Sequence, residues 1–151
     1  MNFIKNLFKK ESSKSDTVSF EPNELQIAVS KILVRTAKID DEFHILEEQK
    51  ILELLTKYFS LNDEDSKNLL ELGISEEKSA TDLYAYTNTI KKSLELSERK
   101  KIIEMMWQII VTDDNFDPYE NNLVWRVAEL IGISTRERVQ IKKDFLSTLN
   151  G

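Results

Sequence analysis

The most informative stretch of this chain is Thr112-Asp113-Asp114-Asn115-Phe116-Asp117-Pro118-Tyr119-Glu120. It contains four carboxylates, one of the two prolines of the chain and no positive charge. Apolar residues recur at helical spacing on both sides of it, from Ile102 to Ile109 before it and from Leu123 to Ile131 after it. Such spacing on both flanks predicts two amphipathic helices joined by a short acidic turn.

A second acidic turn, from Asp40 to Glu47, lies earlier in the chain and aligns with this stretch without a gap. The alignment pairs Asp40 with Asp113, Asp41 with Asp114, Phe43 with Phe116 and Glu47 with Glu120. The flanking residues match in their apolar character, as expected for an internal repeat. We therefore predict two related helix–acidic turn–helix units, which would bring both turns to one pole if the units pack about a pseudo-twofold axis.

The composition favours an all-α fold. Only three glycines and two prolines occur in 151 residues, whereas β folds need many turns and many such residues. We predict one domain of about seven helices in a compact bundle over residues 21–151, preceded by an amphipathic segment and a flexible linker over residues 1–20. Trp107 and Trp125 lie at helical spacing among apolar residues and are expected in the core or partly buried.

Local signals predict where several helices begin and end. The first long helix is expected to run from Pro22 to near Ile39. The stretch Asn62-Asp63-Glu64-Asp65 is rich in capping residues and would start a third, short helix. Gly73 would end this helix and leave residues 74–80 as a polar connection. Ser97 is expected to open a later helix. The helix after Pro118 should stop at Gly132, and Ser134 should start the last helix.

The sequence argues against several classes of protein. The chain has no cysteine, so disulfides and thiolate metal sites are excluded. No basic stripe with interleaved aromatic residues suggests nucleic-acid binding, and no apolar run approaches the roughly 20 residues that span a bilayer. A Gly-rich phosphate loop, a nucleophile elbow and a histidine cluster are all missing. We therefore expect no enzyme, with a carboxylate- or metal-dependent hydrolase kept as an alternative.

The N-terminal segment carries Phe3, Ile4, Leu7 and Phe8 on one helical face, with lysines mostly elsewhere. A short basic amphipathic helix of this kind suits contact with an anionic membrane surface. The alternatives are that it packs on the domain or frays, because isolated helices of about two turns are marginal in water. A peripheral membrane adaptor is therefore a second functional hypothesis.

Part of each acidic turn is explained by helix capping. Asp117, Pro118 and Glu120 suit the N-cap, first and third positions of a helix.

The paired aspartates of each turn instead follow the end of the preceding helix, where the dipole disfavours acids by about 0.3–1 kcal/mol each. Oxygen ligands in this pattern suit a hard cation such as Ca²⁺ or Mg²⁺. Solvated acids or a surface for a basic partner are the alternative. The candidate metal ligands are Asp40, Asp41, Glu47, Asp113, Asp114 and Glu120. His44, the only histidine, is more simply a solvated turn residue.

The two turns resemble those of the tellurite-resistance protein B (TerB) family, which includes the N-terminal domain of DjlA co-chaperones. The family turn reads roughly Asp-Gly-Glu-hydrophobic-x-Pro-x-Glu and occurs twice. Here the copies are residues 40–47 and 113–120, and the second is followed by the family-like stretch 123–128. The usual glycine is Asp41 or Asp114, and the usual proline is Ile45 in the first copy. The resemblance covers about residues 24–146.

The resemblance implies an all-helical domain with an acidic pole. The absence of cysteine suits a reducing compartment, so we expect a bacterial, cytoplasmic protein. Members of the family are associated with tellurite and general stress resistance, and calcium binding has been proposed for them. They are thought to act in membrane-associated complexes, which implies an unidentified protein partner and a place at the inner membrane surface. Taken together, we expect a non-enzymatic interaction module whose acidic pole binds a divalent cation or a basic partner.

Overall fold

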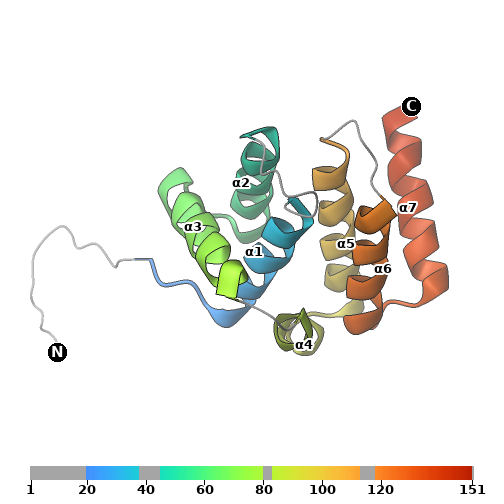
Figure 1. The fold of residues 1–151 in the computed structure, drawn as a ribbon, viewed down its shortest axis with the longest axis horizontal. Coiled ribbons are helices and arrows are strands. Elements are labelled where there is room, and N and C mark those ends of the chain that lie inside the picture. The colour runs from blue at the N-terminus through green and yellow to red at the C-terminus, as the bar shows by residue number, and fades with distance from the viewer. Residues whose placement is uncertain (1–19, 38–44, 80–82, 113–117, 151) are drawn as a thin grey trace, which may run out of the picture.

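The computed structural model describes residues 20–37, 45–79, 83–112 and 118–150. All regular secondary structure in these ranges is helical, as the composition predicted (Figure 1). The seven helices are α1 (Glu24–Ala37), α2 (Ile45–Phe59), α3 (Asp63–Ser79), α4 (Leu83–Ser93), α5 (Leu96–Ile110), α6 (Pro118–Leu130) and α7 (Thr135–Asn150). The predicted N-terminal segment with Phe3, Ile4, Leu7 and Phe8 lies outside the described residues.

The internal repeat comprises three helices in each copy. The alignment that pairs Glu47 with Glu120 also places the start of α2 on the start of α6, and it places the starts of α1 and α3 next to those of α5 and α7. The sequence reveals only the first two helices of each unit. Helix α4 has no counterpart; it lies beneath the two units and contacts α1 and α6 (Figure 1). The units meet mainly where α1 and α2 contact α5.

The second helix of each unit ends in the same way. Ser60 after α2 and Gly132 after α6 both have positive φ, 54° and 82°. The next amide donates back into the helix in each case, from Leu61 N to Thr56 O at 3.1 Å and from Ile133 N to Ala128 O at 2.8 Å. This six-to-one hydrogen bond with a left-handed residue is the Schellman motif. The predicted turn at Gly132 is confirmed.

The third helix of each unit begins where the sequence predicted, and each has a side-chain cap. Asn62 Oδ1 accepts a hydrogen bond from Asp65 N at 2.7 Å. Ser134 Oγ accepts one from Glu137 N at 3.1 Å, and Glu137 Oε1 accepts one from Ser134 N at 3.1 Å. This reciprocal pair is a capping box. The predicted cap at Ser97 is wrong: α5 already begins at Leu96, after Glu95, which makes no capping hydrogen bond through its side chain.

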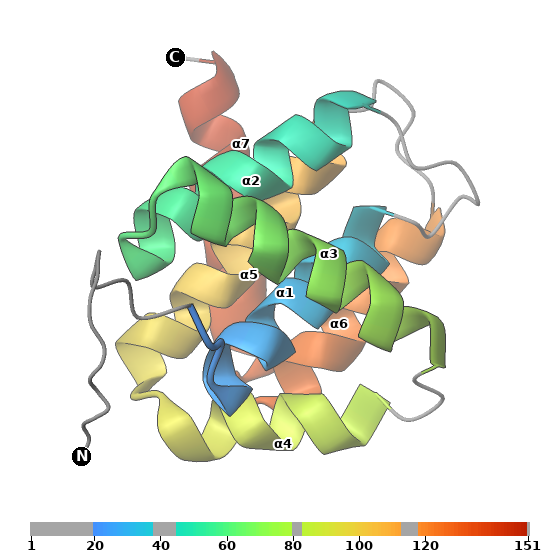
Figure 2. The ribbon, with the colours of Figure 1, turned by 90° about the vertical axis from the view of Figure 1, so that its left-hand side faces the viewer.

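The core is one mainly aliphatic cluster with members from both units and from α4. Its largest fully buried side chains are Ile32, Leu33, Ile51, Leu55, Leu69, Ile90, Ile102, Ile103, Met106, Ile109, Ile110 and Ile131. Most come from α1 and α5, the helices at the centre of the bundle (Figure 2). Trp107 is buried there, whereas Trp125 on α6 is 46% exposed.

Gly73 does not end a helix. Helix α3 continues through it to Ser79, so the predicted polar connection over residues 74–80 is wrong up to that point. A Cβ on Gly73 would clash with the Ser30 hydroxyl and lie 2.9 Å from Ser30 Cβ. The glycine therefore allows α1 and α3 to approach closely. Ile74, the next residue, is partly buried and packs against the core within the same helix.

Arg99 ties the ends of two helices together. Its Nε donates to Leu94 O at 3.0 Å, just after α4, and its Nη1 donates to Ile131 O at 2.7 Å, just after α6. Carbonyls at helix ends lack partners within the helix, so one guanidinium satisfies both ends. It thereby fixes α4 against the second unit.

No helix in the described ranges is long and apolar enough to cross a membrane.

Candidate functional site

The two turn glutamates occupy the same position in the two units. Glu47 is the third residue of α2, Glu120 is the third residue of α6, and they are 2% and 3% exposed. Each therefore lies in a helical first turn, where free amides and the helix dipole favour a negative charge. Each of these two residues has an interaction partner in the fold.

A third glutamate occupies the same position in its helix and serves as a cap and an ion-pair partner. Glu137 is the third residue of α7 and closes a capping box with Ser134, yet its side chain remains 30% exposed and also pairs with Lys100 Nζ at 3.2 Å. Hydrogen bonds from Ser134 and then from Lys100 hold the pKa of Glu137 below its usual value. Glu47 and Glu120 are buried, whereas Glu137 is only partly buried.

The other predicted ligands lie outside the described residues. These are Asp40, Asp41, Asp113 and Asp114, together with His44. Among residues that the structure does describe, no three acidic or histidine side chains gather as a metal site. Helices α2 and α6 both begin toward the right-hand side of Figure 2, so their first turns lie on the same side of the bundle.

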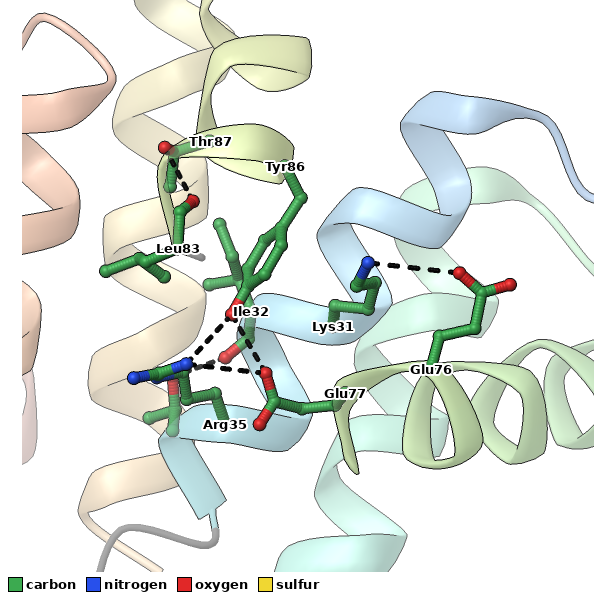
Figure 3. A network of polar contacts seen from close by, with 9 residues as sticks. Lys31, Ile32, Arg35, Glu76, Glu77, Leu83, Tyr86 and Thr87 are labelled. Carbon is green, nitrogen blue, oxygen red and sulfur yellow. Dashed lines mark hydrogen bonds and ion pairs between the residues drawn. The ribbon is translucent and has the colours of Figure 1, made fainter. Parts of the chain in front are cut away.

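A polar network between α1, α3 and α4 was not predicted (Figure 3). Tyr86 Oη donates to Glu77 Oε2 at 2.9 Å and accepts a hydrogen bond from Arg35 Nη1 at 3.4 Å. Arg35 also pairs with Glu77 at 3.6 Å. Burial and the hydrogen bond to Glu77 raise the pKa of Tyr86 to about 12. Arg35 is distant in the sequence from Glu77 and Tyr86, and the three residues follow no motif, so only the packing of the helices reveals them.

A similar contact joins α2 to α5. Tyr58 Oη donates to Glu98 Oε1 at 3.1 Å, and Glu98 pairs with Lys101 at 3.0 Å. Burial, followed by the hydrogen bond to Glu98, raises the pKa of Tyr58 well above its usual value. Both tyrosines therefore act as neutral hydrogen-bond donors that link the helices.

An open pocket of about 220 Å³ lies beside the first network. Residues of α1, α3 and α4 line it, among them Lys31, Glu76 and Tyr86. A second pocket of about 210 Å³ lies between α2 and α5, where Tyr58, Lys101 and Glu104 contribute to its walls. Both are separate from the first turns of α2 and α6.

Fold and site together define a class: an all-helical domain made of two three-helix units, each with a buried glutamate at the start of its second helix. The family model for tellurite resistance protein TerB matches residues 26–143, and the chain belongs to this family. The structure is also similar to that of a protein of unknown function, PG1108 from Porphyromonas gingivalis W83. The TM-score is 0.60 at 14% identity, over 91% of this chain and 98% of the other, which supports the fold alone. No curated protein gives a significant match.

Proposed function

We propose that this protein is a non-enzymatic interaction module of the tellurite- and stress-resistance type whose acidic pole binds a divalent cation, Ca²⁺ or Mg²⁺. The proposed ligands are the carboxylates of Asp40, Asp41, Glu47, Asp113, Asp114 and Glu120. Binding of a protein partner at this pole would then depend on the concentration of the cation.

The burial of Glu47 and Glu120 carries the proposal. Removing an ionised carboxylate from water is costly unless positive charge or hydrogen-bond donors surround it. Both residues have interaction partners in the fold, and first-turn amides can contribute to this compensation. Glu137 shows that a glutamate at the same helical position stays partly exposed when it serves only as a cap and ion-pair partner. Hard cations prefer carboxylate oxygens, so a bound ion would give a reason for two equivalent buried glutamates.

The test is calorimetric titration of the full chain with CaCl₂ and with MgCl₂. We expect heat of binding for at least one ion. Binding should be lost in Asp113→Asn and reduced in Glu120→Gln, while the matched control Glu104→Gln, an exposed glutamate of α5, should bind like the native chain. Silence with both ions would refute the cation site and leave the acids as a surface for a basic partner.

Contact with a membrane through Phe3, Ile4, Leu7 and Phe8 stays a prediction from the sequence. Sedimentation with anionic liposomes, with and without residues 1–12, tests it independently of the cation. Equal sedimentation of both proteins would remove the anchoring role.

A further inference from the structure

The pocket between α1, α3 and α4 combines an apolar lining with a partly buried positive charge, that of Lys31. Ile27 and Ala28 of α1 and Ala85 and Tyr86 of α4 provide the apolar part of the lining. Its volume of about 220 Å³ is smaller than the pockets that hold drug-sized ligands. The pocket therefore suits a small molecule.

The Lys31 ammonium in this pocket is ion-paired with Glu76 but donates no hydrogen bond to a described residue. Its side chain is 16% exposed, and its nearest carboxylate oxygen, Glu76 Oε1, is 3.8 Å away, beyond hydrogen-bond distance. Nζ also lies 4.7 Å from the centre of the Tyr86 ring, which attracts the charge but accepts no conventional hydrogen bond (Figure 3). An ammonium carries three donors. No described residue accepts a hydrogen bond from it, so an acceptor that entered the pocket would take these donors in place of solvent, beside the ion pair with Glu76.

The other polar groups of the lining define the rest of the ligand. Thr89 also lines the pocket, and its hydroxyl makes no hydrogen bond to any described residue, so it offers a second donor. Glu24 and Glu76 contribute carboxylates to the same lining. Two acids beside one lysine disfavour a multiply charged anion such as phosphate. They suit a ligand that carries one carboxylate and one positive charge.

We propose that this pocket binds a free α-amino acid with a medium-sized apolar side chain. The carboxylate of the ligand would accept hydrogen bonds from Lys31 and Thr89. Its ammonium would face the carboxylate of Glu24, and its side chain would lie against Ile27, Ala85 and the Tyr86 ring. The site is separate from the acidic pole, so neither proposal depends on the other.

Titration of the full chain with L-leucine, L-methionine and L-phenylalanine, followed by amide chemical shifts, tests this proposal. We expect saturable shifts for residues of α1 and α4 with at least one of them. Millimolar affinity is expected because so small a ligand makes few contacts. L-leucinamide, which lacks the carboxylate, and N-acetyl-L-leucine, which lacks the ammonium, should both bind at least about tenfold more weakly than L-leucine.

Two variants test the donors separately. Lys31→Met keeps the length of the side chain but removes the charge, and Thr89→Val keeps the shape but removes the hydroxyl. Each should weaken binding roughly tenfold, because a hydrogen bond to a charged group is lost. Lys143→Met, an exposed lysine of α7, is the matched control and should leave binding unchanged. Thermal melts of each variant verify the fold.

Three results would overturn the proposal. One is the absence of shifts with all three amino acids at millimolar concentration. Another is native-like binding by both Lys31→Met and Thr89→Val. The third is binding of L-leucinamide as tight as that of L-leucine, which would assign the pocket to cations held by Glu24 and Glu76 without recognition of a carboxylate.

Discussion

Glu47 and Glu120 are equivalent residues of two internal repeats, and both carboxylates are buried in the first turn of a helix, at 2% and 3% exposure. The same number of residues separates Glu47 from Glu120, Asp40 from Asp113 and Asp41 from Asp114, so one alignment without gaps pairs the two acidic turns. The repeat thus places a buried glutamate twice at the same helical position.

The first prediction concerns the stability that a bound cation would add. Calcium should raise the melting temperature of the native chain, because a ligand that binds only the folded state stabilises it. The free energy of unfolding would rise by about 2.7 kcal/mol at a calcium concentration 100 times Kd. Glu47→Gln and Glu120→Gln should each reduce this increase. Glu53→Gln, an exposed residue of α2, should retain it. A full increase in both buried variants would argue against their role as ligands.

The second prediction concerns the contact between α1 and α3. Gly73→Ala should lower the free energy of unfolding by roughly 1–3 kcal/mol, because the added methyl group overpacks against Ser30. Its cost should be smaller in a Ser30→Gly background, which a double-mutant cycle by urea denaturation measures. Ser75→Ala, an exposed position of the same helix, should be nearly neutral. A stabilising Gly73→Ala would show that helix propensity outweighs the contact.

The third prediction compares the two helix ends with positive φ. Gly132→Ala should destabilise the fold by about 1–2 kcal/mol, since φ of 82° is strained for an L-residue and the new Cβ would lie 2.9 Å from Arg99 Nη1. Ser60→Gly should instead stabilise it by up to about 1 kcal/mol, because Ser60 already carries that strain. Chemical denaturation of both variants measures the difference. Changes of the same sign would contradict the equivalence of the two ends.

The fourth prediction concerns stability at high pH. The pKa of Tyr86 is raised from 10.0 to about 12 by burial and by its hydrogen bond to Glu77. The folded state therefore holds its proton above pH 10 while the unfolded chain loses it, so stability falls between about pH 10 and 12. Urea midpoints across this range should fall less steeply in Tyr86→Phe than in the native chain. The exposed Tyr84→Phe should keep the native slope, and an unchanged slope in Tyr86→Phe would exclude this residue as the cause.

Local features of the helices could be predicted where a short-range interaction decides them. Asn62 and Ser134 cap the helices that they precede, and Gly132 takes the left-handed conformation after α6. Capping depends on atoms within a few residues of one another. The same signal failed at Gly73, because a glycine that ends a helix and a glycine that admits a neighbouring helix look alike in sequence.

The candidate site could be predicted only in part. The repeat singled out Glu47 and Glu120 as a pair, but their burial depends on what packs around them. The ion pairs and hydrogen bonds of Arg35, Glu77 and Tyr86 and the pocket at Lys31 had no signal in the sequence. Their partners come from three helices that meet only in the folded chain.

The all-helical class, the duplicated acidic turn and the resemblance to the family follow from the sequence alone, because helical periodicity and short motifs are properties of neighbouring residues. Three properties appear only in the folded chain: each repeat has three helices, α1 and α3 approach closely at Gly73, and Glu47 and Glu120 are removed from water. These properties depend on which helix faces pack together, and packing is set by the whole core rather than by any one segment.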